Sequence, residues 1–237
     1  MLYLYQTIIS QPILNLLVFF YQTIAFHDLG LAIIFVTILI RLILYPFFHK
    51  SAKQQMLMQR IQPHVKKIQE QHKDDRQKQG EALMALYKEH GVNPFSGFLL
   101  LILQIPILIA LYRLFLGGLG ADQLKLLYSF IPMPQMINST LLGIIDLHSK
   151  NLILVLLAGL AQYFQARLAI YRAPGAQGPL SQAEKLARQM AFAGPIVTVL
   201  IFYNLPAAVG LYWFISSLFS VLQQYFVNKH LQKKYGA

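Results

Sequence analysis

The chain has 237 residues, of which 56% are hydrophobic and 12% are charged, and it carries a net charge of +11. A water-soluble domain carries far more charge, so the composition excludes that class and predicts a membrane protein with several spans. Cysteine is absent, which excludes disulfide bonds, thiolate metal sites and a cysteine nucleophile.

The segment 1–28 is expected to form a helix at the outer face of the membrane. Pro12 divides it, and the apolar run Ile13–Ala25 is short for a membrane span. Tyrosines and phenylalanines are typical of the membrane surface, so an interfacial helix is the favoured interpretation. A sixth span is the alternative, and it would place the N-terminus in the cytoplasm. No Lys or Arg precedes Asp28, which favours an N-terminus outside.

The segment 29–49 contains the first predicted span and the most informative residue of the chain. The apolar run Leu29–Phe48 has 20 residues, enough to cross a bilayer, and Arg41 is the thirteenth of them. A guanidinium near the middle of a membrane costs about 2.5–3.5 kcal/mol on the insertion scale. No Asp or Glu lies inside another apolar run. We therefore expect Arg41 to face water or to await a carboxylate from another molecule.

The segment 50–91 is predicted to form a cytosolic helical hairpin. Apolar residues recur at helical spacing before and after the polar turn Gln71–Gly80. The two stripes consist of Leu57, Ile61, Val65 and Ile68, and of Leu83, Met84 and Tyr87. Pro63 is expected to kink or break the first helix. The pattern leaves two roles open, a simple connection between spans and a mobile arm that receives a partner.

The rest of the chain alternates between apolar and polar segments, and four further spans bring the C-terminus to the cytoplasm. The segments are a second span at 92–116, an outer interfacial loop at 117–151, a third span at 152–171, a cytosolic loop at 172–189, a fourth span at 190–204, a fifth span at 205–228 and a basic cytosolic tail at 229–237. The predicted fold class is an all-α polytopic membrane protein with five transmembrane helices.

The basic residues gather in the segments that this topology places in the cytoplasm. Nine of the 20 lie between Lys50 and Lys88. Seven more lie around the end of the third span, before the fourth span and in the tail: Arg167, Arg172, Lys185, Arg188, Lys229, Lys233 and Lys234. An excess of Lys and Arg marks cytoplasmic segments, so we assign the charge to membrane topology and expect no specific nucleic-acid recognition.

Signatures of an enzyme or of a metal site are missing from the sequence. The seven histidines lie in loops or at span edges, and none forms an H-E-x-x-H pair. No phosphate-binding glycine loop is present either. We therefore expect no catalytic residue, no bound metal and no cofactor.

Polar residues within the spans instead predict a hydrated cavity among the helices. Thr37 lies one turn before Arg41 on the same helical face, and Gln104 lies near the centre of the second span. The fifth span carries a mixed stripe at helical spacing, formed by Trp213, Ser217, Ser220 and Gln224. Structural roles are the alternative, because Ser and Thr in membrane helices often bond to carbonyls of their own helix and Gln can join two helices.

Several stretches of the chain resemble the YidC/Oxa/Alb family of membrane-protein insertases, in the same order and at the same spacing. They are RLILYPF, QRIQPHVKKIQE, ALYKEHGVNPFSG, LILQIPILIALY, AGLAQYFQ and LPAAVGLYWFISSL. The resemblance extends over residues 8–230, and the length resembles the short form common in Gram-positive-type bacteria. It implies five spans around a hydrophilic groove that is open to the cytoplasm and the lipid and closed on the outside.

The resemblance also implies roles for single residues. Arg41 matches the arginine of the family's groove, and Thr37, Gln104 and Trp213 match other groove-lining positions. Ser217 stands where the family often has Asn, and it completes the candidate set for binding a client. The hairpin matches an arm thought to recruit clients, and the basic tail matches an end that faces the ribosome.

These features lead to the hypothesis of an insertase in the bacterial cytoplasmic membrane, with the N-terminus outside and the C-terminus in the cytoplasm. The expected partners are nascent membrane-protein clients and the lipid bilayer, with the ribosome, the signal recognition pathway and the general secretion channel as further candidates. Two alternatives stay open. The protein could be a small anion transporter or channel that uses Arg41, or a structural assembly factor for other complexes.

Overall fold

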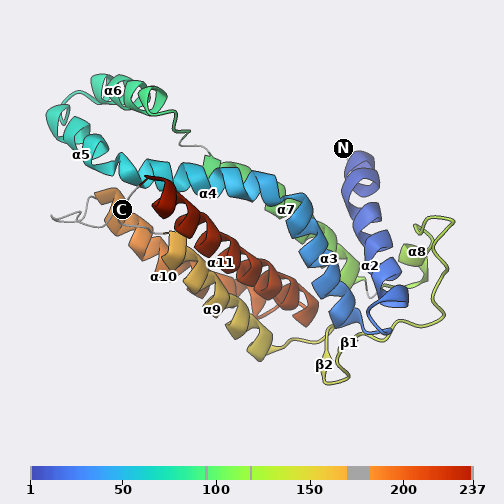
Figure 1. The fold of residues 1–237 in the computed structure, drawn as a ribbon. Helices are drawn as coiled ribbons and strands as arrows, with labels where there is room; N and C mark the ends of the chain where they lie inside the picture. The colour runs from blue at the N-terminus through green and yellow to red at the C-terminus, as the bar shows by residue number, and fades with distance from the viewer. Residues whose placement is uncertain (1, 94–95, 118, 170–181, 236–237) are drawn as a thin grey trace.

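The computed structural model describes residues 2–93, 96–117, 119–169 and 182–235, and these form an elongated helical bundle with one small pair of strands (Figure 1). The helices are α1 (Leu2–Tyr5), the π-helical turn η1 (Gln6–Ser10), α2 (Gln11–Thr23), α3 (Leu29–Ile43), α4 (Tyr45–Arg60), α5 (Gln62–Gln71), α6 (Arg76–Glu89), α7 (Ser96–Leu116), α8 (Ala121–Leu124), α9 (Leu152–Ala169), α10 (Gln182–Phe202) and α11 (Ala207–Tyr235). The strands β1 (Thr140–Leu141) and β2 (Ile145–Asp146) pair antiparallel.

Length and composition mark several of these helices as candidate membrane spans. Within the described residues, Tyr3–Thr23 and Leu152–Ala169 could each cross a membrane, and α3 with α4 adds a third span if the bent pair counts as one. Ile102–Leu116 and Phe192–Phe202 are shorter apolar helices. The structure therefore has the helical character of the predicted fold class. The number of five spans stays a prediction.

A sharp bend divides the first predicted span. The axes of α3 and α4 differ by 63°, and the break lies at Leu44. Pro46 follows in the first turn of α4, and its missing N–H group removes the hydrogen bond that Leu42 would otherwise receive. The apolar run 29–49 is thus two helices in the structure. Beyond the bend, α4 continues to Arg60, deep into the segment expected to be cytosolic.

The N-terminal segment forms one continuous helix that runs antiparallel to α3 (Figure 1). Pro12 does not divide it, because this residue lies in the first turn of α2, directly after the π-helical turn η1. Leu14 and Leu17 are fully buried in the main core. Near the other end, the Tyr5 hydroxyl donates a hydrogen bond of 2.8 Å to the carbonyl of Pro106 in α7. The helix thus packs against α3 and α7, and its interfacial placement stays a prediction.

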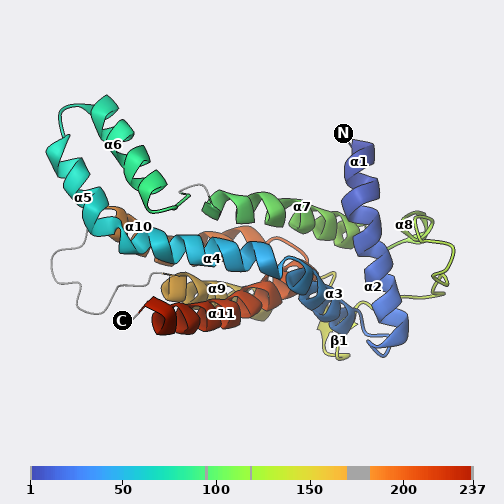
Figure 2. The same cartoon turned by 45° about the horizontal axis from the view of Figure 1, so that its top comes forward.

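The segment expected to be a hairpin contains α5 and α6, which stand clear of the bundle (Figure 2). α5 begins after a break at Ile61 and carries Pro63 in its first turn. Asp75 caps α6 by accepting a hydrogen bond from the backbone N–H of Lys78, which also holds the pKa of Asp75 below its ordinary value. Met84, which belongs to the predicted apolar stripe, is 57% exposed. Leu86, which does not, is buried in the core of the hairpin. The buried residues of this separate core are Ile61, Val65, Leu86 and Val92.

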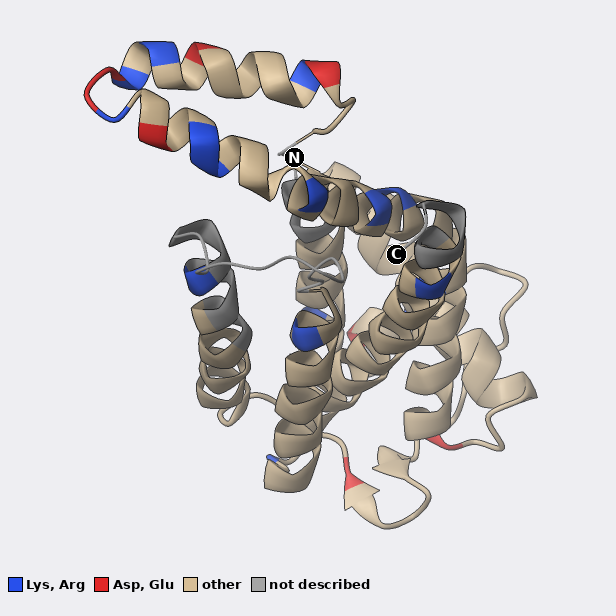
Figure 3. Ribbon diagram, turned by 60° about the vertical axis from the view of Figure 1, so that its left-hand side comes forward, with Lys and Arg blue, Asp and Glu red and all other residues tan. Residues whose placement is uncertain are grey.

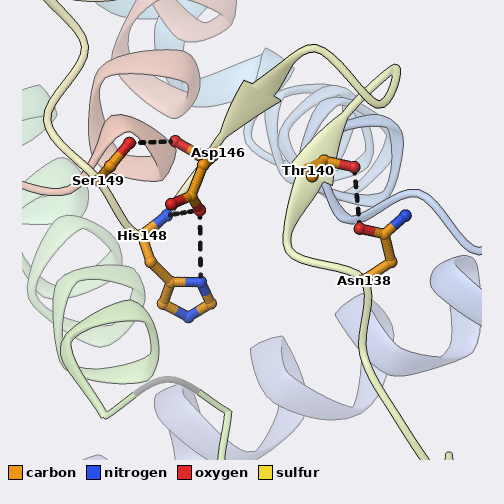
Figure 4. A network of polar contacts seen from close by, with 5 residues as sticks. All are labelled: Asn138, Thr140, Asp146, His148 and Ser149. Atoms are coloured by element: carbon orange, nitrogen blue, oxygen red, sulfur yellow. Dashed lines mark hydrogen bonds and ion pairs between the residues drawn. The ribbon is translucent and has the colours of Figure 1, made fainter.

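The loop between α7 and α9 closes the end of the bundle opposite the hairpin. Its β1–β2 turn is tied by short contacts of Asp146 with His148 and Ser149, and of Thr140 with Asn138 (Figure 4). Leu147 is 1% exposed and belongs to the main core. The carbonyl of Leu147 accepts a hydrogen bond from the first turn of α11, which satisfies one of its free N–H groups. Through Leu147, the loop thus packs against the main core and the start of α11.

Charge is distributed unevenly between the two ends of the molecule. Lysines and arginines gather on the hairpin, where acidic residues also lie, and on the neighbouring ends of the bundle helices, and fewer charged residues are seen at the opposite end (Figure 3). The helices also extend further toward the basic end than expected, because α10 begins at Gln182 and α11 continues to Tyr235. Of the predicted loop 172–189, residues 172–181 lie outside the described part of the chain.

Gly30 provides a test of how closely the loop between α7 and α9 packs on α3. A Cβ atom at Gly30 would lie 2.8 Å from the Cα of Leu141, too close for either backbone to remain in place. We expect Gly30→Ala to lower the stability by about 1–3 kcal/mol, as overpacking does in other cores. Thermal unfolding of the purified protein in detergent measures the change.

The matched control is Gly80→Ala in α6, where no atom lies within 4 Å of the added Cβ. Alanine favours a helix over glycine, so this variant should unfold at the wild-type temperature or above it. Equal unfolding temperatures for Gly30→Ala and the wild type would contradict the close packing of Leu141 on α3.

Candidate functional site

Arg41 lies in the last turn of α3 and is only 6% exposed. Its Nε and Nη2 atoms donate hydrogen bonds of 2.8 Å and 2.5 Å to the hydroxyl of Ser216 in α11. The ring of Phe48 covers the other side, with its centroid 4.3 Å from Cζ. The Nη1 atom is buried and makes no hydrogen bond to a described residue. Arg41 thus keeps an unmet donor in a site where water has little access.

The sequence predicts that Arg41 either faces water or awaits a carboxylate from another molecule, and the second alternative stays a prediction. No carboxylate of the described residues forms an ion pair with it. The guanidinium does not face water, however, because a serine hydroxyl and an aromatic ring enclose it. A hydroxyl oxygen and a ring face satisfy part of the positive charge without neutralising it.

Gln104 in α7 joins the same cluster. Its amide donates hydrogen bonds to the hydroxyl of Tyr212 and, at 3.4 Å, to the hydroxyl of Ser216. Tyr212 is 1% exposed and Ser216 is 2% exposed, so both hydroxyls lie inside the bundle. Three helices therefore meet at Ser216, and Arg41 and Gln104 are the two predicted site residues that the structure brings together.

The other three predicted residues do not contact Arg41. Thr37 is buried and donates its hydroxyl proton to the carbonyl of Ile33, one turn earlier in its own helix. The indole N–H of Trp213 donates a hydrogen bond of 3.1 Å to Gln162 in α9. Ser217 is 3% exposed and makes no side-chain hydrogen bond to a described residue. For Thr37, the structural role left open by the sequence is the one observed.

Tyr212 and Ser216 were missed by the sequence analysis, although a signal for them exists. Polar groups in α11 follow helical spacing in two overlapping stripes. The stripe that meets Arg41 contains Tyr212, Ser216, Ser220 and Gln223, and the stripe chosen from the sequence begins at Trp213. The two differ by a rotation of one residue, about 100° around the helix. Periodicity cannot decide which of them faces α3.

A polar cavity of about 550 Å³ opens beside this cluster, toward the end of the bundle that carries the hairpin. It lies between α4, α9, α11 and the start of α7. Its lining residues are Phe48, Ser51, Ala52, Gln55, Met58, Gln59, Gln62, Asn93, Ser96, Gln162, Gln165, Ala166, Ala169, Ser220, Gln223 and Gln224. Seven of them are glutamines and none is charged, so we call it the glutamine-lined cavity.

Hydrogen bonds from the lining side chains hold the helices around the glutamine-lined cavity. Gln59 donates a hydrogen bond to the carbonyl of Ala169, at the C-terminal end of α9, where carbonyl groups have no partner within the helix. Gln223 donates to the carbonyl of Tyr45 at 3.3 Å, close to the bend between α3 and α4. The Oε1 atoms of Gln59 and Gln62 are buried and accept no hydrogen bond from a described residue. The lining residues are thus largely polar, and none of them is charged.

The described residues contain no cluster of three or more His, Asp or Glu side chains that could hold a metal ion.

Comparisons with known proteins identify relatives of the whole described bundle. The family model described as "60Kd inner membrane protein" matches residues 19–234. A protein named Membrane protein insertase YidC from Geobacter metallireducens is 30% identical over 225 residues, which are 94% of this chain and 37% of the relative. The protein of the same name from Francisella tularensis subsp. novicida is 36% identical over 205 residues, 86% of this chain and 33% of the relative. The chain therefore spans about a third of the length of these relatives.

The hydrogen bonds to Arg41 generate a prediction about stability. Replacing Ser216 by Ala removes the oxygen that accepts from Nε and Nη2, and it leaves a buried guanidinium with three unmet donors. Leaving buried charged donors unpaired costs about 1–3 kcal/mol or more. We expect Ser216→Ala to lower the stability accordingly, measured by thermal or denaturant unfolding in detergent.

The neighbouring variant Ser217→Ala is the control, because it removes an equally buried hydroxyl without a bonded partner among the described residues. It should change the stability little. Equal losses for the two variants would show that the hydroxyl of Ser216 does not support Arg41.

Proposed function

The chain belongs to the family of 60Kd inner membrane proteins, and on that premise we propose that it is an insertase for membrane proteins. The single observation that carries the proposal is the glutamine-lined cavity, which opens at the basic end of a bundle whose other end is closed by a packed loop. Such a cavity offers polar groups at membrane depth to a client that enters from one side only. The names of the relatives support the same activity.

The proposed orientation places the basic end in the cytoplasm. The excess of Lys and Arg on the hairpin and the adjacent helix ends supports it (Figure 3). In this orientation, α3 with the start of α4, then α7, α9, α10 and α11 are the five proposed spans. The N-terminal helix Tyr3–Thr23 is long and apolar enough to add another. The protein resides in a bacterial inner membrane.

In the proposed mechanism, a client delivers a polar tail to the cavity and an apolar segment to the lipid. Polar groups lose water as they enter a membrane, and an unpaired one costs several kcal/mol on transfer to an apolar medium. Glutamine amides both donate and accept hydrogen bonds, so the cavity replaces part of the lost water. The oxygens of Gln59 and Gln62 are buried and unpaired among the described residues, and in the proposal they accept hydrogen bonds from the tail once these side chains turn toward the cavity.

Arg41 is the proposed binding group for acidic tails. Its unpaired Nη1 donor can bind a carboxylate, and hydrogen bonds between charged partners are about twice as strong as neutral ones. The membrane potential, positive outside, then pulls the acidic tail outward by about 2.3 kcal/mol per charge per 100 mV.

The proposed exit for the client's apolar segment is the lipid beside α9 and α10. Large apolar side chains are exposed on both helices, among them Phe164, Phe192 and Leu200. Burial of apolar surface in lipid drives release of the client at about 25 cal/mol per Å².

The hairpin α5–α6 and the basic end of α11 are the proposed contact region for partners on the cytoplasmic side. The hairpin has its own small core and stands clear of the bundle, as a receiving arm would (Figure 2). The ribosome, the signal recognition pathway and the general secretion channel are the candidate partners.

Insertion into proteoliposomes tests the proposal. Vesicles with the purified protein should insert a single-span client with an acidic tail at least severalfold better than empty vesicles. We expect Arg41→Lys to retain activity, and Arg41→Glu to reduce insertion of the acidic client about tenfold, equivalent to 1.4 kcal/mol. A client with a neutral tail should respond much less, because it has no carboxylate for Arg41 to bind.

Arg113→Ala is the control, since Arg113 is exposed near the other end of α7. No gain over empty vesicles would reject the insertase. Saturable anion flux in the same vesicles would instead favour an anion transporter, a role that the 6% exposure of Arg41 and the closed outer end do not support.

A further inference from the structure

We propose that Phe48 is a specificity-determining residue, an aromatic lid that separates Arg41 from the glutamine-lined cavity and sets how much negative charge a client's tail must carry to reach it. The inference rests on the proposed function. It goes beyond that function because it assigns the selection among clients to a residue whose side chain carries no charge and forms no hydrogen bond.

The position of Phe48 is the first step. Its ring lies over the guanidinium of Arg41, at 4.3 Å from Cζ, and its side chain also lines the cavity. Arg41 itself is not among the described residues that line the cavity. Phe48 and Arg41 are 8% and 6% exposed. The ring therefore lies against the guanidinium of Arg41, and Phe48 also belongs to the wall of the cavity.

The chemistry of the contact makes the lid selective. The face of an aromatic ring attracts a cation, but this attraction is weaker than that of a carboxylate with a guanidinium. A carboxylate can therefore take the place of the ring, and a neutral tail gains too little from Arg41 to do so. The unpaired Nη1 donor adds to this difference, because the ring leaves it without a hydrogen bond and a carboxylate oxygen can accept one.

The surroundings of Phe48 give the ring room to move. It lies in the first turn of α4, just after the break at Leu44, where the helix axis bends by 63°. The adjoining cavity of about 550 Å³ is large enough to receive a phenyl ring. A rotation of the side chain into that space would uncover Arg41 without unpacking the bundle.

Two measurements on the full chain test the lid. The first is the rate at which phenylglyoxal modifies Arg41 in the purified protein, followed by mass spectrometry, with the exposed Arg76 as the internal reference. The second is proteoliposome insertion of one client whose tail carries zero, one or two Asp residues. The variants are Phe48→Ala and Phe48→Leu, and the matched control is Phe47→Ala, because Phe47 is 48% exposed and has no contact with Arg41 in the structure.

We expect Phe48→Ala to raise the modification rate of Arg41 at least tenfold, Phe48→Leu to raise it less, and Phe47→Ala to leave it unchanged. Phe48→Ala should also bring insertion of the client with one Asp to the level of the client with two, and leave the neutral client unchanged. Adding Arg41→Lys to Phe48→Leu should not abolish insertion, while adding Arg41→Ala to Phe48→Ala should remove the gain.

An unchanged modification rate in Phe48→Ala would overturn the proposal, because the ring would then not cover Arg41. The proposal would also be overturned if Phe48→Ala raised the modification rate but left the insertion of the clients with zero, one and two Asp residues unchanged. The ring would then cover Arg41 without selecting clients. Failure of the wild-type protein to insert any client would reject the proposed function and the selection with it. The modification rates would still show in that case whether Phe48 covers Arg41.

Discussion

The guanidinium of Arg41 is buried among apolar helices without a carboxylate partner among the described residues, and the arrangement of the central helices depends on accommodating it. Its donors require an acceptor inside the bundle, and Ser216 of α11 provides one. The hydroxyl of Ser216 in turn lies within reach of Gln104, so α3, α7 and α11 must approach one another at this level. Phe48 covers the remaining face because α4 turns sharply at Leu44.

The same requirement explains why α11 is less apolar than a span usually is. Within the described part of the chain, α11 is not among the helices whose length and composition suit a membrane span. Its polar side chains face two neighbours: Ser216 meets Arg41 on one side, and Trp213 meets Gln162 of α9 on the other. Small residues allow this, since Ala207, Ala208 and Gly210 bring the outer end of α11 close to the rest of the bundle. Polar contacts with α3 and α9 therefore hold α11 in its place in the bundle.

The chemistry and spacing of the residues predict well where the helices lie in the sequence. They predict poorly which side chains of different helices contact one another. An arginine in an apolar run is informative by itself, because few environments can hold it, and no acid of the described residues forms an ion pair with it. The position of the polar stripe on α11 is a different problem, since the stripes that begin at Tyr212 and Trp213 both satisfy a helical period. Which of them meets Arg41 depends on the rotation of α11 against α9, a property of packing between distant segments. The bend at Leu44 has a local cause in Pro46, but its angle depends on what α4 packs against.

An uncharged lining beside a covered charge has a physical advantage for the proposed insertase, which would accept many different tails. A lysine or glutamate in the cavity would bind tails of one sign strongly and repel the other, and a low dielectric would make both effects large. Glutamines offer donors and acceptors to either kind of tail, with hydrogen bonds weak enough to break again. Charge recognition is then confined to one buried guanidinium. In the proposed mechanism a ring covers that group, so a carboxylate contacts it only after the tail has entered the cavity and displaced the ring.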